Sequence, residues 1–190
     1  MDAVSRTRTV YGTNTHRFVE KYLSVSTADR YGTEFCEALD GKRILDIGCG
    51  PGSDLATFTS RGYEVVGLDV VSAFLQVVDR NTSESAVVQG DMRQIPFQDA
   101  SFDGVWSSAS FLHIPRSDAI PTLQEFQRIL CDTGVIFLSA KRAPADTDPV
   151  DDRYFEYYDA DEIRQMLSAA GFGQIAVETE SIWVTGTARA

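Results

Sequence analysis

The chain has 190 residues, of which 43% are hydrophobic and 24% charged, a balance typical of a globular domain with a sizeable core. Its apolar runs are too short to cross a bilayer, and its net charge of -11 disfavours a polyanionic partner such as RNA or DNA. We therefore expect one domain over residues 1–190, without a membrane or nucleic-acid partner.

Cysteine and histidine usage narrows the expected chemistry further. The three cysteines, Cys36, Cys49 and Cys131, lack metal or redox spacing and are expected to be reduced thiols. The N-terminus lacks the apolar segment of a secretory signal, so a cytoplasmic location is predicted. With only two histidines in the sequence, no metal site is expected.

The residues before the first strand are predicted to form a helical lid over 1–40, ahead of a Rossmann-like core over 41–190. Residues 1–10 are polar and are expected to be frayed, and two helices follow, over 17–23 and 28–39. Thr27 is a suitable N-cap for the second helix, and Gly41 would end it.

A short apolar strand over 44–47 and a glycine-rich turn come next, a pattern typical of a buried parallel strand. The turn has glycine at positions where a backbone must bend sharply or admit a ligand, namely Gly48, Gly50 and Gly52. The helix over 53–61 would direct its free N–H groups toward whatever occupies the turn. Asp46 lies inside the strand, where an unpaired carboxylate is costly, so we expect it to have a partner at the strand's end.

The remaining chain alternates strands and helices, and the repeated strand–helix–strand units indicate parallel pairing. A turn is predicted at 132–134 and a Pro- and Asp-rich surface loop at 142–153. Asp159 and Glu162 form a capping box that opens the last helix. Further helices are predicted over 73–78 and 117–130, and further strands over 63–69, 86–89, 104–108, 135–139, 175–178 and 182–187.

The predicted fold is therefore a doubly wound α/β sandwich with helices on both faces of a mostly parallel sheet of seven strands. The last strand is expected to be antiparallel, because the short spacing between the final two strands favours a hairpin.

Acidic residues recur where the first three strands end, and ligands of an open parallel sheet bind over the carboxyl ends of its strands. Asp69 can accept both hydroxyls of a ribose, and Asp91 can accept an adenine amino group while the Met92 N–H serves a ring nitrogen. Asp46 can orient the glycine turn or attract a cationic amino-acid group. Each aspartate taken singly is equally well explained as a turn or cap residue, but their recurrence favours a ligand.

The sequence D-I-G-C-G-P-G at 46–52 resembles motif I of the class I S-adenosylmethionine-dependent methyltransferases. A dinucleotide fold would need a third glycine, and neither register of G-x-G-x-x-G supplies one, since Ser53 or Leu55 stands there. The resemblance extends over nearly the whole chain, through G-L-D at 67–69, G-D-M-R-Q-I-P-F at 90–97, S-F-D-G-V-W-S-S-A-S-F-L-H-I-P at 101–115 and the helix-bearing segment 154–172.

This resemblance implies S-adenosylmethionine as cofactor and S-adenosylhomocysteine as its product. It assigns Asp69 to the ribose, Asp91 and Met92 to adenine, and Gly48 and Gly50 to the methionine moiety. Ser108 and Ala109 would border the sulfonium, and Tyr11 is similar to a family tyrosine in the lid. The predicted cofactor-binding residues are Asp46, Gly48, Cys49, Gly50, Asp69, Val70, Asp91, Met92 and Ser108.

Methyl transfer from a sulfonium is an in-line displacement that needs positioning and exclusion of water more than a strong acid or base. If the acceptor is an alcohol, phenol or acid, a base would help. His113 is the first candidate, although a polar residue of a turn explains it equally well, and His16 is the second. Five aromatic residues are candidates for an acceptor pocket, although aromatics more often belong to the core: Trp106, Phe111, Phe155, Tyr157 and Tyr158.

A small-molecule acceptor is predicted, because only the N-terminal helices and the segment 142–158 are available to cover a substrate. The asparagine- or aspartate-proline-proline-aromatic signature of amino-group methyltransferases is absent, since the segment 108–111 reads S-A-S-F. The alternatives are a non-catalytic S-adenosylmethionine-binding module and a methyltransferase that acts on RNA or protein. A nicotinamide oxidoreductase is disfavoured by the missing glycine.

Overall fold

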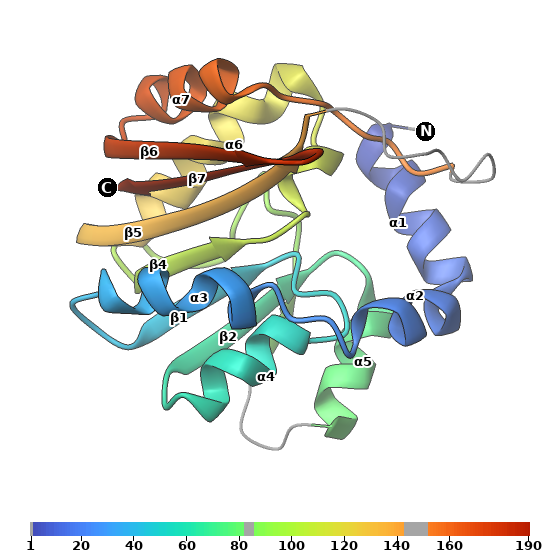
Figure 1. Cartoon of the computed structure of the whole chain (residues 1–190). Helices are drawn as coiled ribbons and strands as arrows, with labels where there is room; N and C mark the ends of the chain where they lie inside the picture. Colours follow the sequence, from blue (N-terminus) through green and yellow to red (C-terminus); the bar gives the residue numbers. More distant parts are fainter. Residues whose placement is uncertain (1, 82–85, 143–151) are drawn as a thin grey trace.

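The computed structural model describes residues 2–81, 86–142 and 152–190, which build one sheet of seven strands flanked by helices (Figure 1). The strand order is β3-β2-β1-β4-β5-β7-β6. The strands are β1 (Arg43–Ile47), β2 (Glu64–Asp69), β3 (Ala86–Gln89), β4 (Phe102–Ser107), β5 (Leu130–Lys141), β6 (Gly173–Glu180) and β7 (Trp183–Arg189).

The pairing confirms the predicted fold. Strands β1 to β5 pair in parallel, whereas β7 runs antiparallel to both β5 and β6. Because the order reverses between β1 and β4, this fold has its crevice over the carboxyl ends of those two strands.

Helices cover both faces of the sheet, and each face has its own apolar core. One face carries the core residues of α3, α4 and α5, and the other carries those of α6 and α7 (Figure 1). The helices are α1 (Ala3–Thr13), α2 (Thr15–Tyr22), α3 (Ala28–Glu37), α4 (Ser53–Ser60), α5 (Ser72–Asn81), α6 (Arg116–Ile129) and α7 (Ala160–Ala169), with a short 3-10 helix, η1 (Phe111–His113). No helix in the described ranges is long and apolar enough to cross a membrane.

The last helix begins as the sequence predicts. Asp159 Oδ1 accepts a hydrogen bond from Glu162 N at 2.8 Å, and Glu162 Oε2 accepts one from Asp159 N at 2.9 Å. This capping box satisfies N–H groups that the helix itself leaves without partners.

The N-terminal residues depart from the prediction, since 1–10 were expected to be frayed and α1 occupies most of them. The helix is capped by Asp2, whose Oδ1 accepts from Ser5 N at 2.8 Å, and it buries Val4 and Thr7 against the rest of the protein. Tertiary packing therefore stabilises a helix whose sequence carries little amphipathic pattern.

Two local predictions are also wrong. Thr27 does not cap α3, because its backbone is already helical and its side chain makes no capping bond. Residues 132–134 form no separate turn and belong to an irregular start of β5, where Phe102 pairs with Leu130 and Gly104 with Val135. Extra residues on one strand of a pair are accommodated as a bulge. The loop predicted at 142–153 falls almost wholly outside the described residues.

Candidate functional site

A pocket of about 580 Å³ lies between the carboxyl ends of the central strands and the lid formed by α1, α2 and α3. Figure 1 shows α1 and α2 standing beyond the ends of the strands, so that they cover this edge of the sheet. All nine residues predicted to bind cofactor line this pocket, together with His113, the first candidate for a base: Asp46, Gly48, Cys49, Gly50, Asp69, Val70, Asp91, Met92 and Ser108.

The turn after β1 is shaped by glycine at two positions with different constraints. A Cβ at Gly48 would lie 2.3 Å from Ser110 Cβ, and the φ of Gly48 is +72°. Ser110 fixes this close approach, because its hydroxyl donates to Ile47 O at 2.7 Å. Apart from its two chain neighbours, no described residue places an atom within 4 Å of where a Cβ of Gly50 would stand, and the φ of Gly50 is +53°, so its backbone is open to a ligand.

Asp69, at the end of β2, joins the turn to the second strand. Its Oδ2 accepts from Gly50 N at 2.9 Å and its Oδ1 from Val71 N at 2.8 Å. Burial raises the pKa of Asp69 to about 6, although these backbone hydrogen bonds act in the opposite direction. The carboxylate is therefore held rigidly, and each oxygen retains a lone pair for a ligand hydroxyl.

Among the described residues, one oxygen of Asp46 lacks the hydrogen-bond partner that the sequence led us to expect. The residue is 2% exposed, and within the described chain its Oδ2 has no hydrogen-bond partner. Burial, followed by the charges of Asp54 and Asp69, raises the pKa of Asp46 well above its usual range. A buried carboxyl oxygen without a hydrogen bond is costly, so a ligand group that donated to it would relieve that cost.

Asp91 also lines the pocket, and an arginine that we did not predict as a site residue holds its carboxylate. Arg93 Nη2 donates to Asp91 Oδ2 at 2.7 Å, and Arg93 Nη1 donates to Asp118 Oδ2 of α6 at 3.1 Å. The sequence signal for this role is the spacing of two residues, which lets Arg93 reach back to Asp91.

The far end of the pocket brings together three residues from distant parts of the chain. Tyr11 Oη lies 3.1 Å from His113 Nε2 and accepts from Arg153 Nη1 at 2.6 Å. His113 Nδ1 lies 2.7 Å from Tyr154 O, and because a carbonyl can only accept, Nδ1 carries a proton there. The neutral ring can then accept the Tyr11 proton at Nε2. Burial raises the pKa of the Tyr11 phenol, so Tyr11 remains protonated at neutral pH.

Fewer of the predicted aromatic residues than of the predicted aspartates line the pocket. Of the five candidates, Phe155 is the one among the pocket's described lining residues. Trp106, Phe111 and Tyr158 are fully buried in the core, where Trp106 stacks on Phe137 with ring centroids 3.9 Å apart. Tyr157 is not part of the pocket lining.

Trp183 and Lys141 line the pocket, whereas His16 does not. Trp183, which we did not predict, lines the pocket because β7 pairs it with Lys141 of β5. The Lys141 ammonium lies 4.8 Å from the ring centroid of Phe155 and 5.7 Å from that of Trp183. His16 is 90% exposed and lies 3.7 Å from Glu20, so it takes no part in the pocket.

Comparison with known proteins agrees with this architecture. Residues 45–138 match the family model described as a methyltransferase domain. The chain belongs to the class I S-adenosylmethionine-dependent methyltransferases. The matched region contains the whole series of motifs from the glycine turn to η1, and the cofactor of this family is S-adenosylmethionine.

Within this methyltransferase family, the malonyl-[acyl-carrier protein] O-methyltransferase of Enterobacter lignolyticus is 36% identical over 95 residues, which are 50% of this chain and 37% of the relative. The match thus spans little more than a third of that protein's length.

Solved structures share the fold over almost the whole chain. The 1,6-didemethyltoxoflavin-N1-methyltransferase of Burkholderia thailandensis has a TM-score of 0.78 at 18% identity, covering 97% of this chain and 87% of its own. The [4+2]-cyclase SpnF has a TM-score of 0.78 at 18% identity, covering 98% and 96%. A cyclase and a methyltransferase thus share this fold, so the reaction must be argued from the pocket.

Proposed function

We propose that this chain binds S-adenosylmethionine and transfers its methyl group to a small-molecule acceptor. The observation that carries the proposal is the convergence of nine residues, predicted from separate motifs, on one pocket wall. A glycine-rich turn alone would be weak support, but the turn, the ribose-type aspartate and the third-strand aspartate occur together at one edge of the sheet.

The chemistry of these residues fits the cofactor. Asp46 Oδ2, which has no hydrogen-bond partner among the described residues, would accept the cationic amino group of the methionine moiety, and the open backbone at Gly50 would lie against that moiety. Asp69 would accept the ribose hydroxyls, and Asp91 with the Met92 N–H would serve adenine. When bound, S-adenosylmethionine supplies an electrophilic methyl group on a sulfonium, and its product is a neutral thioether.

The residues of the lid would exclude water and position the acceptor. Tyr11 and Tyr22 of the lid contact Arg153, whose guanidinium carbon lies 4.9 Å from the ring centroid of Phe155. These contacts bound a modest space beside His113, and this supports a small acceptor over a nucleic acid or a protein.

We further propose that Tyr11 and His113 remove a proton from the acceptor when its nucleophilic atom carries one. The acceptor proton would pass to Tyr11 Oη while the phenol's own proton passes to His113 Nε2. The hydrogen bond from His113 Nδ1 to Tyr154 O keeps Nε2 available as the proton acceptor. The Arg153 guanidinium would stabilise negative charge on the phenol oxygen during the transfer.

The location of the protein is proposed to be cytoplasmic. Its three cysteines are free thiols, and of these Cys49 is buried in the pocket wall. Free thiols are typical of a reducing compartment.

Calorimetric titration with S-adenosylmethionine, S-adenosylhomocysteine and NADH tests the cofactor. We expect micromolar binding of the first two and none of NADH. Asp69→Ala should weaken S-adenosylhomocysteine binding by about 1.5–3 kcal/mol, since a charge-assisted ribose contact is lost. Asp161→Ala is the matched control, because Asp161 is exposed on α7 and pairs with Arg164.

Three results would contradict parts of the proposal. Binding of NADH alone would overturn the cofactor assignment, and unchanged affinity in folded Asp69→Ala would overturn the role of Asp69. Tight binding of the cofactor without turnover in a broad screen of small acceptors would favour a binding module instead.

A further inference from the structure

Asp54, the second residue of α4, is a buried carboxylate that the proposed reaction does not use. The residue is 8% exposed, and both of its oxygens act as acceptors. Its Oδ1 accepts from Ser26 Oγ and from Ala28 N, each at 2.9 Å, and its Oδ2 accepts from Trp106 Nε1 at 2.8 Å. Three donors from two distant parts of the sequence thus converge on one side chain.

Two of these donors belong to the segment that joins α2 to α3 together with the first residue of α3, which we term the lid connector (residues 23–28). Ser26 extends the network, because its hydroxyl lies 2.8 Å from Thr57 Oγ1 of α4 and accepts from Asp29 N at 3.3 Å. The connector also exposes Leu23 and Val25, so little apolar burial holds it in place. Its position over the pocket therefore depends on polar contacts to α4.

The cap of α3 is unusual because a residue of α4 contributes to it. A helix usually receives its N-cap from its own chain just before the first turn, and Thr27 stands at that position. Here Ser26 and the distant Asp54 accept the first N–H groups instead. A local cap would stabilise α3 equally well, but it would not join the lid to the helix that follows the glycine turn.

Moving the connector away would be costly. Asp54 would lose two of its three donors and would be left as a buried charge close to Asp46, whose pKa its charge already raises. The remaining donor, Trp106, packs against Phe35 of α3 with ring centroids 5.1 Å apart, so the same site also contacts the body of that helix. Asp54, Ser26 and Thr27 all line the pocket, so their placement shapes it.

We propose that Asp54 is a positioning residue that holds the lid connector against the glycine-turn helix and thereby keeps the lid over the cofactor site. The part of this statement that concerns the cofactor rests on the proposed function. The part that concerns the lid does not, and the two can be tested separately.

Asp54→Asn is the main variant, because it preserves shape but replaces one acceptor oxygen with an NH₂ group that cannot accept. Hydrogen–deuterium exchange of the ligand-free protein should show amides of residues 23–30 exchanging at least about tenfold faster than in wild type, with β1 and β5 unchanged. Binding of S-adenosylhomocysteine should weaken by about tenfold. Asp29→Asn is the control, since Asp29 lies in the first turn of α3 but has an exposed side chain paired with Arg61.

Ser26→Ala covers the case in which Asp54→Asn does not fold. It removes one lid-side donor and leaves the bond between Asp54 and Trp106 intact, and it should accelerate exchange in the same residues. Exchange of 23–30 at the wild-type rate in every variant that folds would overturn the proposal, as would acceleration spread equally over β1 and β5. If wild type fails to bind S-adenosylhomocysteine, the proposed function fails, whereas the exchange difference still decides the role of Asp54.

Discussion

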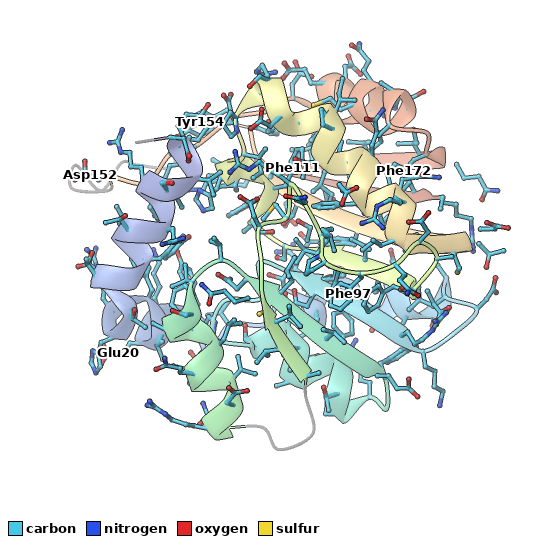
Figure 2. The ribbon with its side chains drawn as sticks, turned by 180° about the vertical axis from the view of Figure 1, so that it is seen from behind. Glu20, Phe97, Phe111, Asp152, Tyr154 and Phe172 are labelled. Carbon is cyan, nitrogen blue, oxygen red and sulfur yellow. The ribbon has the colours of Figure 1, made fainter. Side chains whose placement is uncertain are left out.

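The two walls of the pocket are built in different ways. The cofactor wall (residues 46–50, 69–71, 91–92 and 108–110) is held mainly by main-chain groups and short-range contacts, such as the bonds of Asp69 to Gly50 N and Val71 N. The lid wall (Tyr11, Tyr22, His113, Arg153 and Phe155) is held by side chains from opposite parts of the chain. Figure 2 shows Asp152 and Tyr154 beside α1, where Tyr154 N donates to Thr7 Oγ1 at 3.0 Å.

This difference separates a rigid half of the pocket from an adjustable one. Main-chain hydrogen bonds at strand ends leave little freedom, so the cofactor wall is expected to be much the same with and without ligand. Side-chain contacts between an N-terminal helix and a late segment can break without disturbing the sheet. Substitutions on the first wall should therefore affect folding or cofactor binding, whereas substitutions on the second should affect turnover.

The largest effect is expected from Gly48→Ala. The new Cβ would clash with Ser110 and would occupy a left-handed conformation, so the free energy of unfolding should fall by about 2–5 kcal/mol. Gly50→Ala is the matched variant, because it shares the left-handed φ but meets no neighbour, and it should cost about 1–2 kcal/mol. Denaturant unfolding measures the free energy of unfolding of both variants. Equal decreases would show that the contact with Ser110 adds nothing to the cost of the left-handed conformation.

On the lid wall, Tyr11→Phe tests the proton relay. We expect kcat for an acceptor that carries a proton to fall by about 100-fold, while the affinity for S-adenosylhomocysteine stays within about twofold. Steady-state kinetics with calorimetry separates these quantities, and Tyr157→Phe, outside the pocket lining, is the control. An unchanged kcat would exclude Tyr11 from the reaction.

Acidification should weaken cofactor binding, because it protonates Asp69 of the cofactor wall. Because its pKa is about 6 in the free protein, lowering the pH to about 5 would protonate most of it and weaken S-adenosylhomocysteine binding by about tenfold. Asp46 titrates in the same direction, so Asp69→Asn should bind more weakly at neutral pH and show a shallower pH dependence. Calorimetry between about pH 5 and pH 8 tests this, and an affinity independent of pH would contradict it.

The raised pKa of Asp69 affects folding in the opposite direction, since a lower pH weakens ligand binding but favours the folded state. The folded state holds the Asp69 proton up to about pH 6, whereas the ordinary carboxyl value is 3.8, so the folded state binds more protons between these values. The contribution of Asp69 to the free energy of unfolding is therefore fully present below the lower value and is lost as the pH rises toward 6.

The smallest effect is expected from Gly12→Ala in α1. Outside the helix's own backbone, a Cβ there meets no atom of a described residue within 4 Å, so the substitution should stabilise the helix by about 0.5–1 kcal/mol through the higher helix propensity of alanine. Hydrogen–deuterium exchange should then slow in α1 and remain unchanged in β1. Faster exchange in α1 would contradict this prediction, because it would mean that alanine at position 12 destabilises the helix that Gly12 forms.

The same contrast explains what could be predicted from the sequence. The strands, the turn and the aspartates of the cofactor wall could be predicted because their signals are local, since each aspartate lies within two residues of a strand's carboxyl end. The helix α1, the partners of Tyr11 and the cap at Asp54 could not, because they depend on contacts across the fold. Trp106 was wrongly considered for the pocket, because its sequence position does not reveal that Asp54 binds its ring nitrogen inside the core.

The separation of Tyr11 from Arg153 has a consequence for biosynthesis. The residues of the cofactor wall all lie between Asp46 and Ser110, whereas the lid wall needs a contact between residues 142 positions apart. Chains emerge from the ribosome N-terminal end first, at about 5–20 residues per second. The glycine turn and the first strands can therefore associate while the lid helix still lacks the segment that fastens it. A nascent chain of this protein would therefore form its cofactor wall before the lid could close over it.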